Sequence, residues 1–230
     1  MEIQTAVYTT IIITIFMAIV LVIINRQLVK FDPLSEPKGI VLLVIMFEQY
    51  VEKLVKDKTN DDVSKYLTPY IMTVAAYIFL ANIAGLFSLE SPTSNYSVTL
   101  ALAAITCVLI EVYSFKGRGV KGYIKSWFEP LAPFVVMNIM SKISTLLSLS
   151  LRLFGNILSG GILMTVIYWM LGSISKMIPF IGEFNILGVV IAPALHFYFD
   201  LFSGVMQAFI FITLSVSFIG KELPVKKEEK

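Results

Sequence analysis

The sequence predicts an all-α integral membrane protein with about five membrane crossings and one amphipathic helix on the membrane surface. Of its 230 residues, 57% are hydrophobic and only 15% are charged, and the mean hydropathy is +0.83. An ordinary soluble domain does not need so much apolar surface. The apolar residues also gather in runs that reach or exceed the roughly 20 residues that a helix requires to cross a bilayer.

Charge and cysteine content exclude several classes of partner. The net charge of +2 is too small to indicate a nucleic-acid partner, and the basic residues cluster at the ends of apolar runs rather than on one face. The single cysteine, Cys107, lies inside an apolar run. It can form no intramolecular disulfide, and nothing in the sequence resembles a thiolate metal site. We therefore expect neither a cofactor nor a bound metal.

Residues 5–24 form the first apolar run, which has the length of one crossing. Glu2 precedes this run in place of a basic patch, and no small-residue cleavage motif follows it. We therefore expect the run to remain as a membrane anchor rather than to be removed as a signal peptide. Residues 39–58 then mix apolar and charged positions with a helical period. This pattern is typical of a connecting helix that lies on the cytoplasmic membrane surface.

The second and third crossings lie within residues 67–115, at about 67–89 and 97–115. Basic residues gather after the first and the third crossings, and the positive-inside rule places such segments in the cytoplasm. They are Arg26, Lys30, Lys38, Lys53, Lys56, Lys58 and Lys65 in the first segment and Lys116, Arg118, Lys121 and Lys125 in the second. Five crossings then put the N-terminus outside and the basic tail, residues 220–230, in the cytoplasm.

The last two apolar runs, within residues 131–219, are too long for upright crossings. A run such as 131–171, at about 1.5 Å per residue, would form a helix near 60 Å long, twice the apolar thickness of a bilayer. It must either break into a re-entrant hairpin or lie strongly tilted. The run at 177–219 poses the same problem, although Gly188 and Pro193 could break it. We expect a hairpin of two long, strongly tilted helices.

Each of these two runs carries a single polar stripe. The polar residues recur at spacings of three or four, which places them on one face of a helix. They are Ser141, Thr145, Ser148, Arg152, Asn156 and Ser159 in the fourth run and His196, Asp200, Ser203 and Gln207 in the fifth. Hydroxyl and amide groups alone commonly do no more than link helices. The two charged residues favour a functional interpretation.

Arg152 lies about 20 residues from either end of its run, so it cannot easily reach a headgroup. A charge at that depth costs from about 2.5 to more than 10 kcal/mol and is rarely tolerated without a task. Arginine cannot become neutral by losing its proton, so it needs an anion or a water-filled cavity beside it. A purely structural pair with Asp200 would leave the rest of both stripes unexplained. Glu111, one turn from the cytoplasmic end of its crossing, is close enough to reach the interface.

Four segments of the sequence contain distinctive motifs. Residues 148–156 (SLSLRLFGN) and residues 207–211 (QAFIF) resemble the two signatures of subunit a of F-type ATP synthases. Residues 92–101 resemble the loop that opens the third crossing of the family, and Lys121-Gly122-Tyr123 with Glu129-Pro130 resembles its cytoplasmic loop. The resemblance runs from about Leu67 to Gly220, whereas the first 60 residues match by topology only.

The resemblance implies that Arg152 is the essential arginine facing the carboxylates of the c-ring, with Gln207 as its neighbouring glutamine. Asn156 corresponds to the asparagine of the same signature. Many members have a glutamate nine residues after the arginine and a histidine seven before the glutamine. Gly161 and Asp200 occupy those places here. If positions 161 and 200 lie next to each other in the fold, the half-channel keeps one acid, carried by the other helix.

In that case Asp200, with His196 one turn away, would form the proton relay of a half-channel. Some members also have an acid fourteen residues before the arginine, where this chain has Asn138. Asn138 and Ser141 can offer only hydrogen bonds or water sites. The remaining ion-pathway residues that the stripes predict are Ser148 and Ser203.

The family mechanism that the resemblance implies is ion transfer through two offset half-channels. An ion neutralises a carboxylate of the ring, travels round through lipid and leaves by the other half-channel, because only neutral carboxyls can face lipid. The implied partners are the c-ring, the subunit b stator, the rest of the synthase and membrane lipid. ATP chemistry belongs to those partners, since no GxxxxGK[ST] loop is present. The chain is then a non-catalytic ion-translocating subunit of a bacterial plasma membrane.

Two other classes of function are compatible with the same residues. A secondary transporter could bind its substrate with Arg152 and Asp200, although such folds usually contain internal repeats and no convincing repeat is found here. A structural membrane adaptor predicts that Arg152→Ala leaves activity intact. Neither stripe offers a decisive oxygen cage, so the choice between protons and sodium stays open, with protons preferred.

Overall fold

The computed structural model describes residues 5–31, 36–87, 89–129, 132–176 and 186–223, and every regular element in these ranges is helical. The α-helices are α1 (Thr5–Val29), α2 (Ile40–Lys56), α3 (Asp61–Ile83), α4 (Tyr96–Trp127), α5 (Val135–Ser175), α6 (Ile186–His196) and α7 (Ser203–Glu222). Short helical segments are η1 (Ala84–Phe87), η2 (Pro92–Ser94), η3 (Ala132–Phe134) and the π-helical η4 (Phe197–Phe202). Within these ranges five helical stretches are long and apolar enough to cross a membrane, which confirms the predicted all-α membrane protein.

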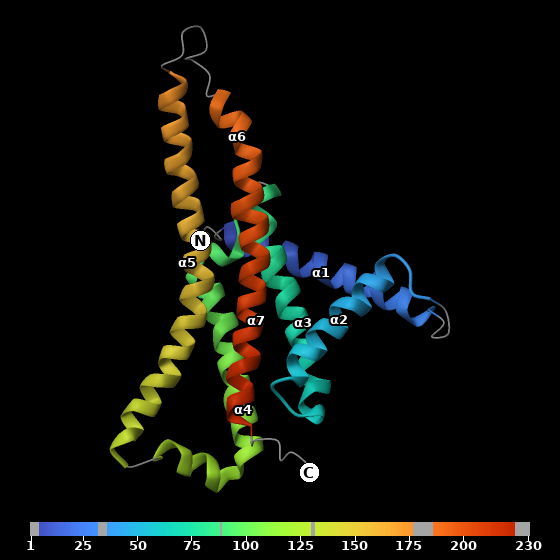
Figure 1. Cartoon of the computed structure of the whole chain (residues 1–230), viewed down its shortest axis with the longest axis vertical. Coiled ribbons are helices and arrows are strands. Elements are labelled where there is room, and N and C mark those ends of the chain that lie inside the picture. The colour runs from blue at the N-terminus through green and yellow to red at the C-terminus, as the bar shows by residue number, and fades with distance from the viewer. Residues whose placement is uncertain (1–4, 32–35, 88, 130–131, 177–185, 224–230) are drawn as a thin grey trace.

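The two longest stretches form an antiparallel hairpin along the longest axis of the molecule (Figure 1). α5 is one unbroken helix of 41 residues, so the alternative of a re-entrant break is wrong. Its sequence contains no proline that would remove a backbone hydrogen bond. The second arm of the hairpin consists of α6, η4 and α7. It continues through Pro193 without ending and changes to π-helical geometry at η4.

α4 extends beyond the predicted end of the third crossing near residue 115 and reaches Trp127. Asn95 caps its start by accepting a hydrogen bond from the Ser97 N–H at 2.9 Å. Gly119 interrupts the helix with φ 67, a conformation that glycine adopts without steric cost. Beyond this kink the last part of α4 lies across the lower end of the bundle (Figure 1).

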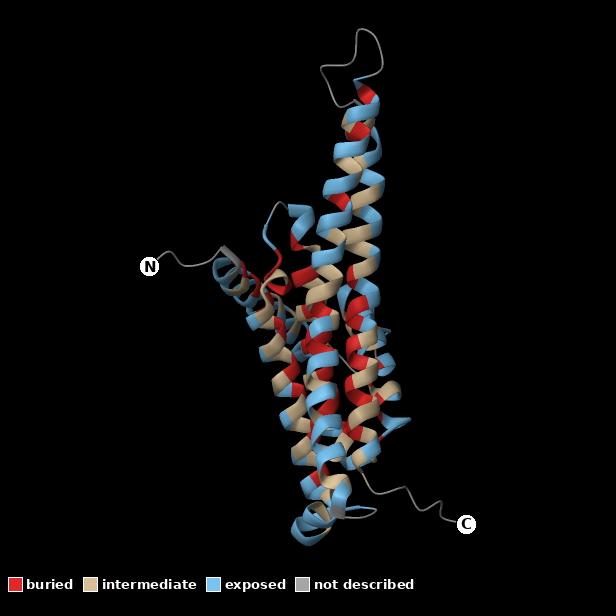
Figure 2. Cartoon of the chain, turned by 90° about the vertical axis from the view of Figure 1, so that its left-hand side faces the viewer, coloured by how far each residue is buried: buried red, intermediate tan, exposed pale blue. Residues whose placement is uncertain are grey.

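α1 is steeply inclined to the hairpin of α5, α6 and α7, as the two perpendicular views together show (Figures 1 and 2). α1 and α5 therefore cannot both stand upright in one flat bilayer. At about 1.5 Å per residue, α5 is about 60 Å long, which exceeds the apolar thickness of a bilayer. It therefore fits an upright crossing less well than α1 does. The strong tilt of the hairpin stays a prediction.

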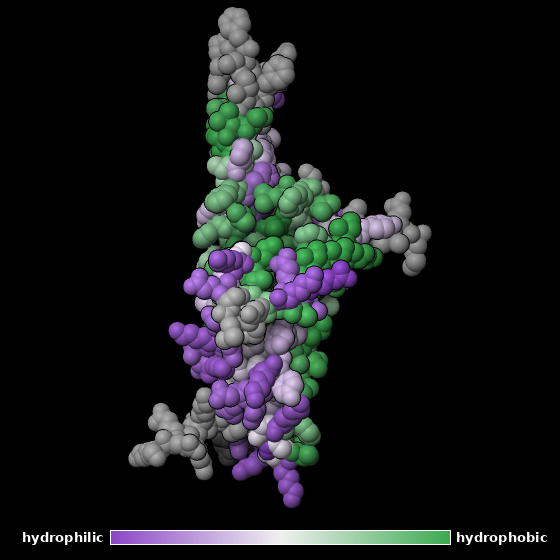
Figure 3. Space-filling view, turned by 90° about the vertical axis from the view of Figure 1, so that its right-hand side faces the viewer, coloured by the Kyte–Doolittle hydropathy of each residue, from purple (hydrophilic) through white to green (hydrophobic). Residues whose placement is uncertain are grey.

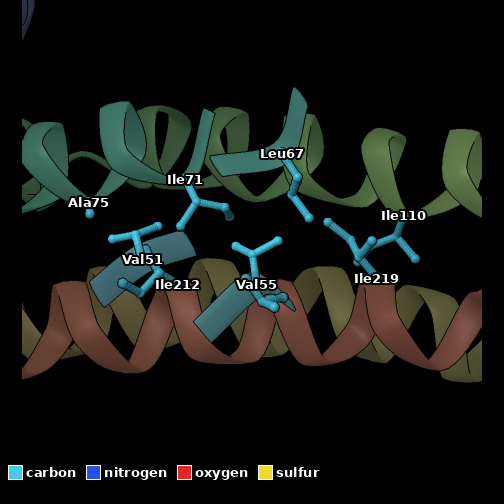
Figure 4. Close-up of a cluster of buried hydrophobic side chains, with 9 residues drawn as sticks. Val51, Val55, Leu67, Ile71, Ala75, Ile110, Ile212 and Ile219 are labelled. Atoms are coloured by element: carbon cyan, nitrogen blue, oxygen red, sulfur yellow. The ribbon is translucent and has the colours of Figure 1, made fainter. Parts of the chain in front are cut away.

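Three clusters of buried apolar side chains hold the described helices together, and the smallest of them joins α1 to the end of α3. In the first, side chains from α2, α3, α4 and α7 interdigitate near the lower end of the bundle, among them Val55, Leu67, Ile110 and Ile219 (Figure 4). The second joins α3, α4, α5 and α7 and contains Leu149 and Leu153 of α5, which are 1% and 0% exposed. The turn of α5 that carries Arg152 is therefore held in place by side chains that are buried in the core.

Much of the remaining surface is apolar. Buried residues gather in the middle and lower bundle, whereas the upper end of the hairpin is mostly exposed (Figure 2). Trp169 is 75% exposed and Val189 is 73% exposed. On the face that Figure 3 shows, hydrophilic residues gather below a broad hydrophobic region. Exposed apolar area of this extent is suited to lipid or to a protein partner.

Candidate functional site

Three titratable side chains form a continuous hydrogen-bonded chain across the hairpin. The His196 Nδ1 atom lies 2.7 Å from Asp200 Oδ2, and the His196 Nε2 atom lies 3.0 Å from the Tyr168 hydroxyl. Tyr168 comes from α5, His196 from the end of α6 and Asp200 from η4. Both imidazole nitrogens are therefore engaged, so the ring can accept a proton at one nitrogen and release its other proton at the opposite nitrogen.

The π-helical segment places Asp200 against the end of α3. An added Cβ at Gly85 of η1 would lie 3.7 Å from Asp200 Cγ and 3.7 Å from Oδ2. The carboxylate therefore lies beside η1, at ordinary contact distance from a Cβ at this position. π-helical turns are rare and occur frequently at functional sites.

The two predicted polar stripes meet at a direct hydrogen bond. The Ser203 hydroxyl donates to Asn156 Oδ1 at 2.9 Å, which joins α7 to α5. Asn156 is one turn beyond Arg152, and Ser203 is one turn beyond Asp200. The bond therefore fixes the part of α5 that carries Arg152 against the start of α7.

Two buried amides lie close to this junction. Gln207 is 5% exposed and Asn82 is 2% exposed, and their side-chain nitrogens have no hydrogen-bond partner within the described ranges. The Asn82 carbonyl oxygen accepts from the Thr93 hydroxyl at 3.1 Å. An added Cβ at Gly204 would lie 3.0 Å from Asn82 Cβ, so α3 and α7 approach closely here. Buried polar atoms of this kind normally bond to water or to another group.

Arg152 is half-buried, and no hydrogen bond or ion pair engages its guanidinium among the residues described. Asp200 pairs with His196 instead. The purely structural Arg152–Asp200 pair considered above is therefore absent from the described part of the chain. An arginine in an apolar hairpin without an internal counter-charge requires an anion or water from elsewhere.

The other predicted site residues are more dispersed. Ser141 and Ser148 are exposed on α5. Asn138 donates to the carbonyls of Trp127 at 2.8 Å and Glu129 at 3.1 Å, so it joins the end of α4 to the start of α5. An added Cβ at Gly161 meets nothing within 4 Å in the described structure. A Cβ at Gly161 would therefore not contact Asp200, and a retained acid shared between the two places stays a prediction.

A second charged cluster, which the sequence analysis did not identify, lies between α4 and α5. Lys142 Nζ lies 2.6 Å from Glu111 Oε2, and the Tyr123 hydroxyl donates to the same oxygen at 2.7 Å. The Lys142 ammonium also lies 4.4 Å from the centre of the Trp127 ring. Glu111 is thus ion-paired with α5. Lys142 could have been found from the sequence, because it is a charged residue inside the same apolar run as Arg152.

Tyr168 and Asn82 were also missed, and no sequence signal marks them. Tyr168 is uncharged and lies off the polar stripe of its helix, and its partner His196 is 28 residues away. Asn82 is one amide in the apolar run of α3. Only the packing of the helices shows that these two side chains adjoin the stripes.

Comparison with known proteins gives consistent matches. The family model described as ATP synthase A chain matches residues 6–220. Relatives named ATP synthase subunit a include those of Desulforamulus reducens, 35% identical over 67% of this chain and 56% of that protein, and of Streptococcus agalactiae, 30% identical over 79% and 78%. The Crocosphaera subtropica protein named ATP synthase subunit a 1 is 28% identical over 90% and 81%.

Proposed function

This chain belongs to the ATP synthase subunit a family, and on that basis we propose that it translocates protons in the membrane sector of an F-type ATP synthase. The protons pass through two half-channels that meet the c-ring at Arg152. The match to the family favours this function over the secondary transporter and the structural adaptor.

The observation that carries the proposal is the guanidinium of Arg152, half-buried in an apolar hairpin and without a counter-charge among the described residues. A permanent cation in this position is stabilised by an anion that comes and goes. A ring carboxylate that passes Arg152 supplies that anion. The fixed positive charge favours loss of the carboxyl proton there and blocks direct leakage between the half-channels.

The chain of Tyr168, His196 and Asp200 supports a proton path on the outer side of Arg152. These groups lie between Arg152 and the end of the hairpin that we place outside the cell. The buried amides of Asn82 and Gln207 adjoin the same helices, and polar groups of this kind recruit water. A proton could therefore move by the hydrogen-bonded side chains and by water.

The length of the hairpin favours a partner that runs along both α5 and α7. We propose that α5 and α7 lie strongly tilted against the c-ring, that subunit b binds elsewhere on the chain, and that the chain resides in a bacterial plasma membrane with its N-terminus outside. A proton moving through about 100 mV gains about 2.3 kcal/mol, so several protons must be coupled to each ATP.

ATP-driven acidification of inverted vesicles that carry the whole synthase tests the proposal. Arg152→Ala is expected to abolish pumping, because the ring carboxylates lose the cation that keeps them ionised, while ATP hydrolysis by the detached head persists. Comparing proton uptake with and without sodium tests the ion. Pumping at the native rate in Arg152→Ala would contradict the proposal and favour the structural adaptor.

A further inference from the structure

A cavity of about 940 Å³ lies between α4, α5 and α7 at the end of the bundle where the basic residues gather. Its walls are largely apolar, but the ion pair of Glu111 and Lys142 lies in them. Ser141 and Thr145, two members of the polar stripe of Arg152, line the same cavity. One cavity therefore touches both a carboxylate of α4 and the stripe that leads along α5 to Arg152.

We propose that Glu111 is the carboxylate that exchanges protons in the cytoplasmic half-channel of this chain, with Lys142 and Tyr123 as the positioning residues that hold its ionised form. The inference rests on the proposed function and adds to it a residue on a third helix. The outer path, with Asp200, and this inner path would then each contain one carboxylate, on opposite sides of Arg152.

The position of the pair along α5 suits an inner path. Lys142 lies seven residues after the start of α5 and ten residues before Arg152. At about 1.5 Å per residue, the pair is about 15 Å from Arg152 along the helix axis, on the side of the basic residues that gather in the last part of α4. A proton that leaves a ring carboxyl near Arg152 would reach Glu111 before it reaches the cytoplasm.

The groups around Glu111 are ones that pair with an ionised carboxylate. Lys142 Nζ lies 2.6 Å from Oε2, and the Tyr123 hydroxyl donates to the same atom. Lys116 and Lys221 also line the cavity, and Cys107 lies one turn earlier on α4. The nearby carboxylate of Glu222 is engaged by Arg118 at 3.2 Å and by Ser114 at 2.8 Å. The ion pair with Lys142 and the hydrogen bond from Tyr123 offset the cost of placing the Glu111 anion in a largely apolar wall.

The proposed proton transfer requires only the ring carboxyl, water and Glu111. A ring carboxyl releases one proton to water in the cavity, and the water passes one proton to Glu111. Both recorded contacts use Oε2, so Oε1 is the atom that accepts it. Glu111 then releases the proton to cytoplasmic water and returns to its ion pair with Lys142. At 35% exposure its side chain can reach both the cavity wall and water.

A purely structural role for the ion pair predicts different behaviour in a double variant. Glu111→Gln alone leaves Lys142 without its partner, which disturbs the packing of α4 against α5. The double variant Glu111→Gln with Lys142→Met removes both charges and restores a neutral contact. If the pair only held the helices together, the double variant would conduct normally. If Glu111 exchanges protons, conduction stays low although the complex assembles.

The test is passive proton conduction through the membrane sector of vesicles from which the head has been removed. We expect Glu111→Gln and the double variant to lose at least about tenfold in conduction, which is less than the roughly 10²–10⁴-fold that one positioned acid or base contributes, because water can carry part of the transfer. Glu222→Gln, at the edge of the same cavity, is the matched control and should conduct normally. Native conduction in the double variant, or an equal loss in Glu222→Gln, overturns the proposal.

The single cysteine supplies a second, independent measurement. Because Cys107 lines the cavity, a charged water-soluble thiosulfonate added at the cytoplasmic face should label it, and Cys107→Ser should remove the label from this chain. Absence of labelling would mean a dry or lipid-filled cavity and would overturn the inference. Arg152→Ala in the ATP-driven assay separates the two claims. If it pumps normally, the proposed function fails. If it does not pump and Glu111→Gln conducts normally, only the inference fails.

Discussion

At the scale of single residues, the arrangement of Asp200 differs from a simple ion pair with Arg152. The carboxylate is 2.7 Å from His196 Nδ1 and lies against Gly85. The imidazole separates it from Tyr168 on the other long helix. Asp200 is therefore placed to exchange a proton with a histidine, and Arg152 is left for a partner outside the chain.

Asp200→Asn should keep the shape of this site and remove its titratable group. Because a positioned acid or base typically contributes about 10²–10⁴-fold, we expect ATP-driven pumping to fall by about 10-fold or more, the remainder being supplied by water. The measurement is acidification of inverted vesicles, with the exposed Asp62→Asn at the start of α3 as control. Equal pumping by both variants would remove Asp200 from the proton path.

Gly85 gives a graded test of the same site. The added Cβ of Gly85→Ala would lie 3.7 Å from the Asp200 carboxylate, an ordinary contact, so this variant should pump normally. Gly85→Leu would occupy the space of the carboxylate and displace it from His196, so pumping should fall as in Asp200→Asn. Quantifying subunit a in the membrane shows that the variant is present. Normal pumping by Gly85→Leu would show that the carboxylate position is unimportant.

At the scale of the helices, the polar stripes could be predicted from the sequence, because the helical period alone decides which residues share a face. The hydrogen bond from Ser203 to Asn156 shows that the two predicted stripes meet. The π geometry of η4 could not be predicted, since π-helical turns are rare and no residue type in the sequence marks one. The contacts of Tyr168 and Asn82 depend on tertiary packing.

The end of α7 is positioned by a close approach that only glycine permits. An added Cβ at Gly220 would lie 2.5 Å from the carbonyl oxygen of Lys58, a backbone atom that cannot easily move. We expect Gly220→Ala to destabilise the packing of α7 on the α2–α3 link by about 1–3 kcal/mol, the usual cost of overpacking.

Thermal release of the subunit from the purified synthase measures this effect. Gly160→Ala on α5 is the matched control, because its added Cβ meets nothing within 4 Å, and alanine favours a helix over glycine by about 1 kcal/mol. Gly220→Ala should be released at a lower temperature than the native chain, and Gly160→Ala should not. Equal release temperatures would show that α7 can shift without cost.

At the scale of the whole molecule, the steep angle between α1 and the hairpin (Figure 1) and the 41-residue length of α5 have a joint consequence. If α1 crosses the bilayer upright, the hairpin must lie strongly tilted. A tilted pair of helices presents an extended edge to a cylindrical partner. Arg152 then lies between the hydrogen-bonded chain of Asp200 on one side and the Glu111 cavity on the other.

Electron cryo-microscopy of the whole synthase would show directly where Arg152 lies relative to the c-ring. We expect a carboxylate of the c-ring to approach the Arg152 guanidinium within the roughly 4 Å of an ion pair, with α5 and α7 tilted along the ring. An Arg152 that faces lipid, or that pairs with Asp200 while the ring carboxylates pass at a distance, would contradict this expectation.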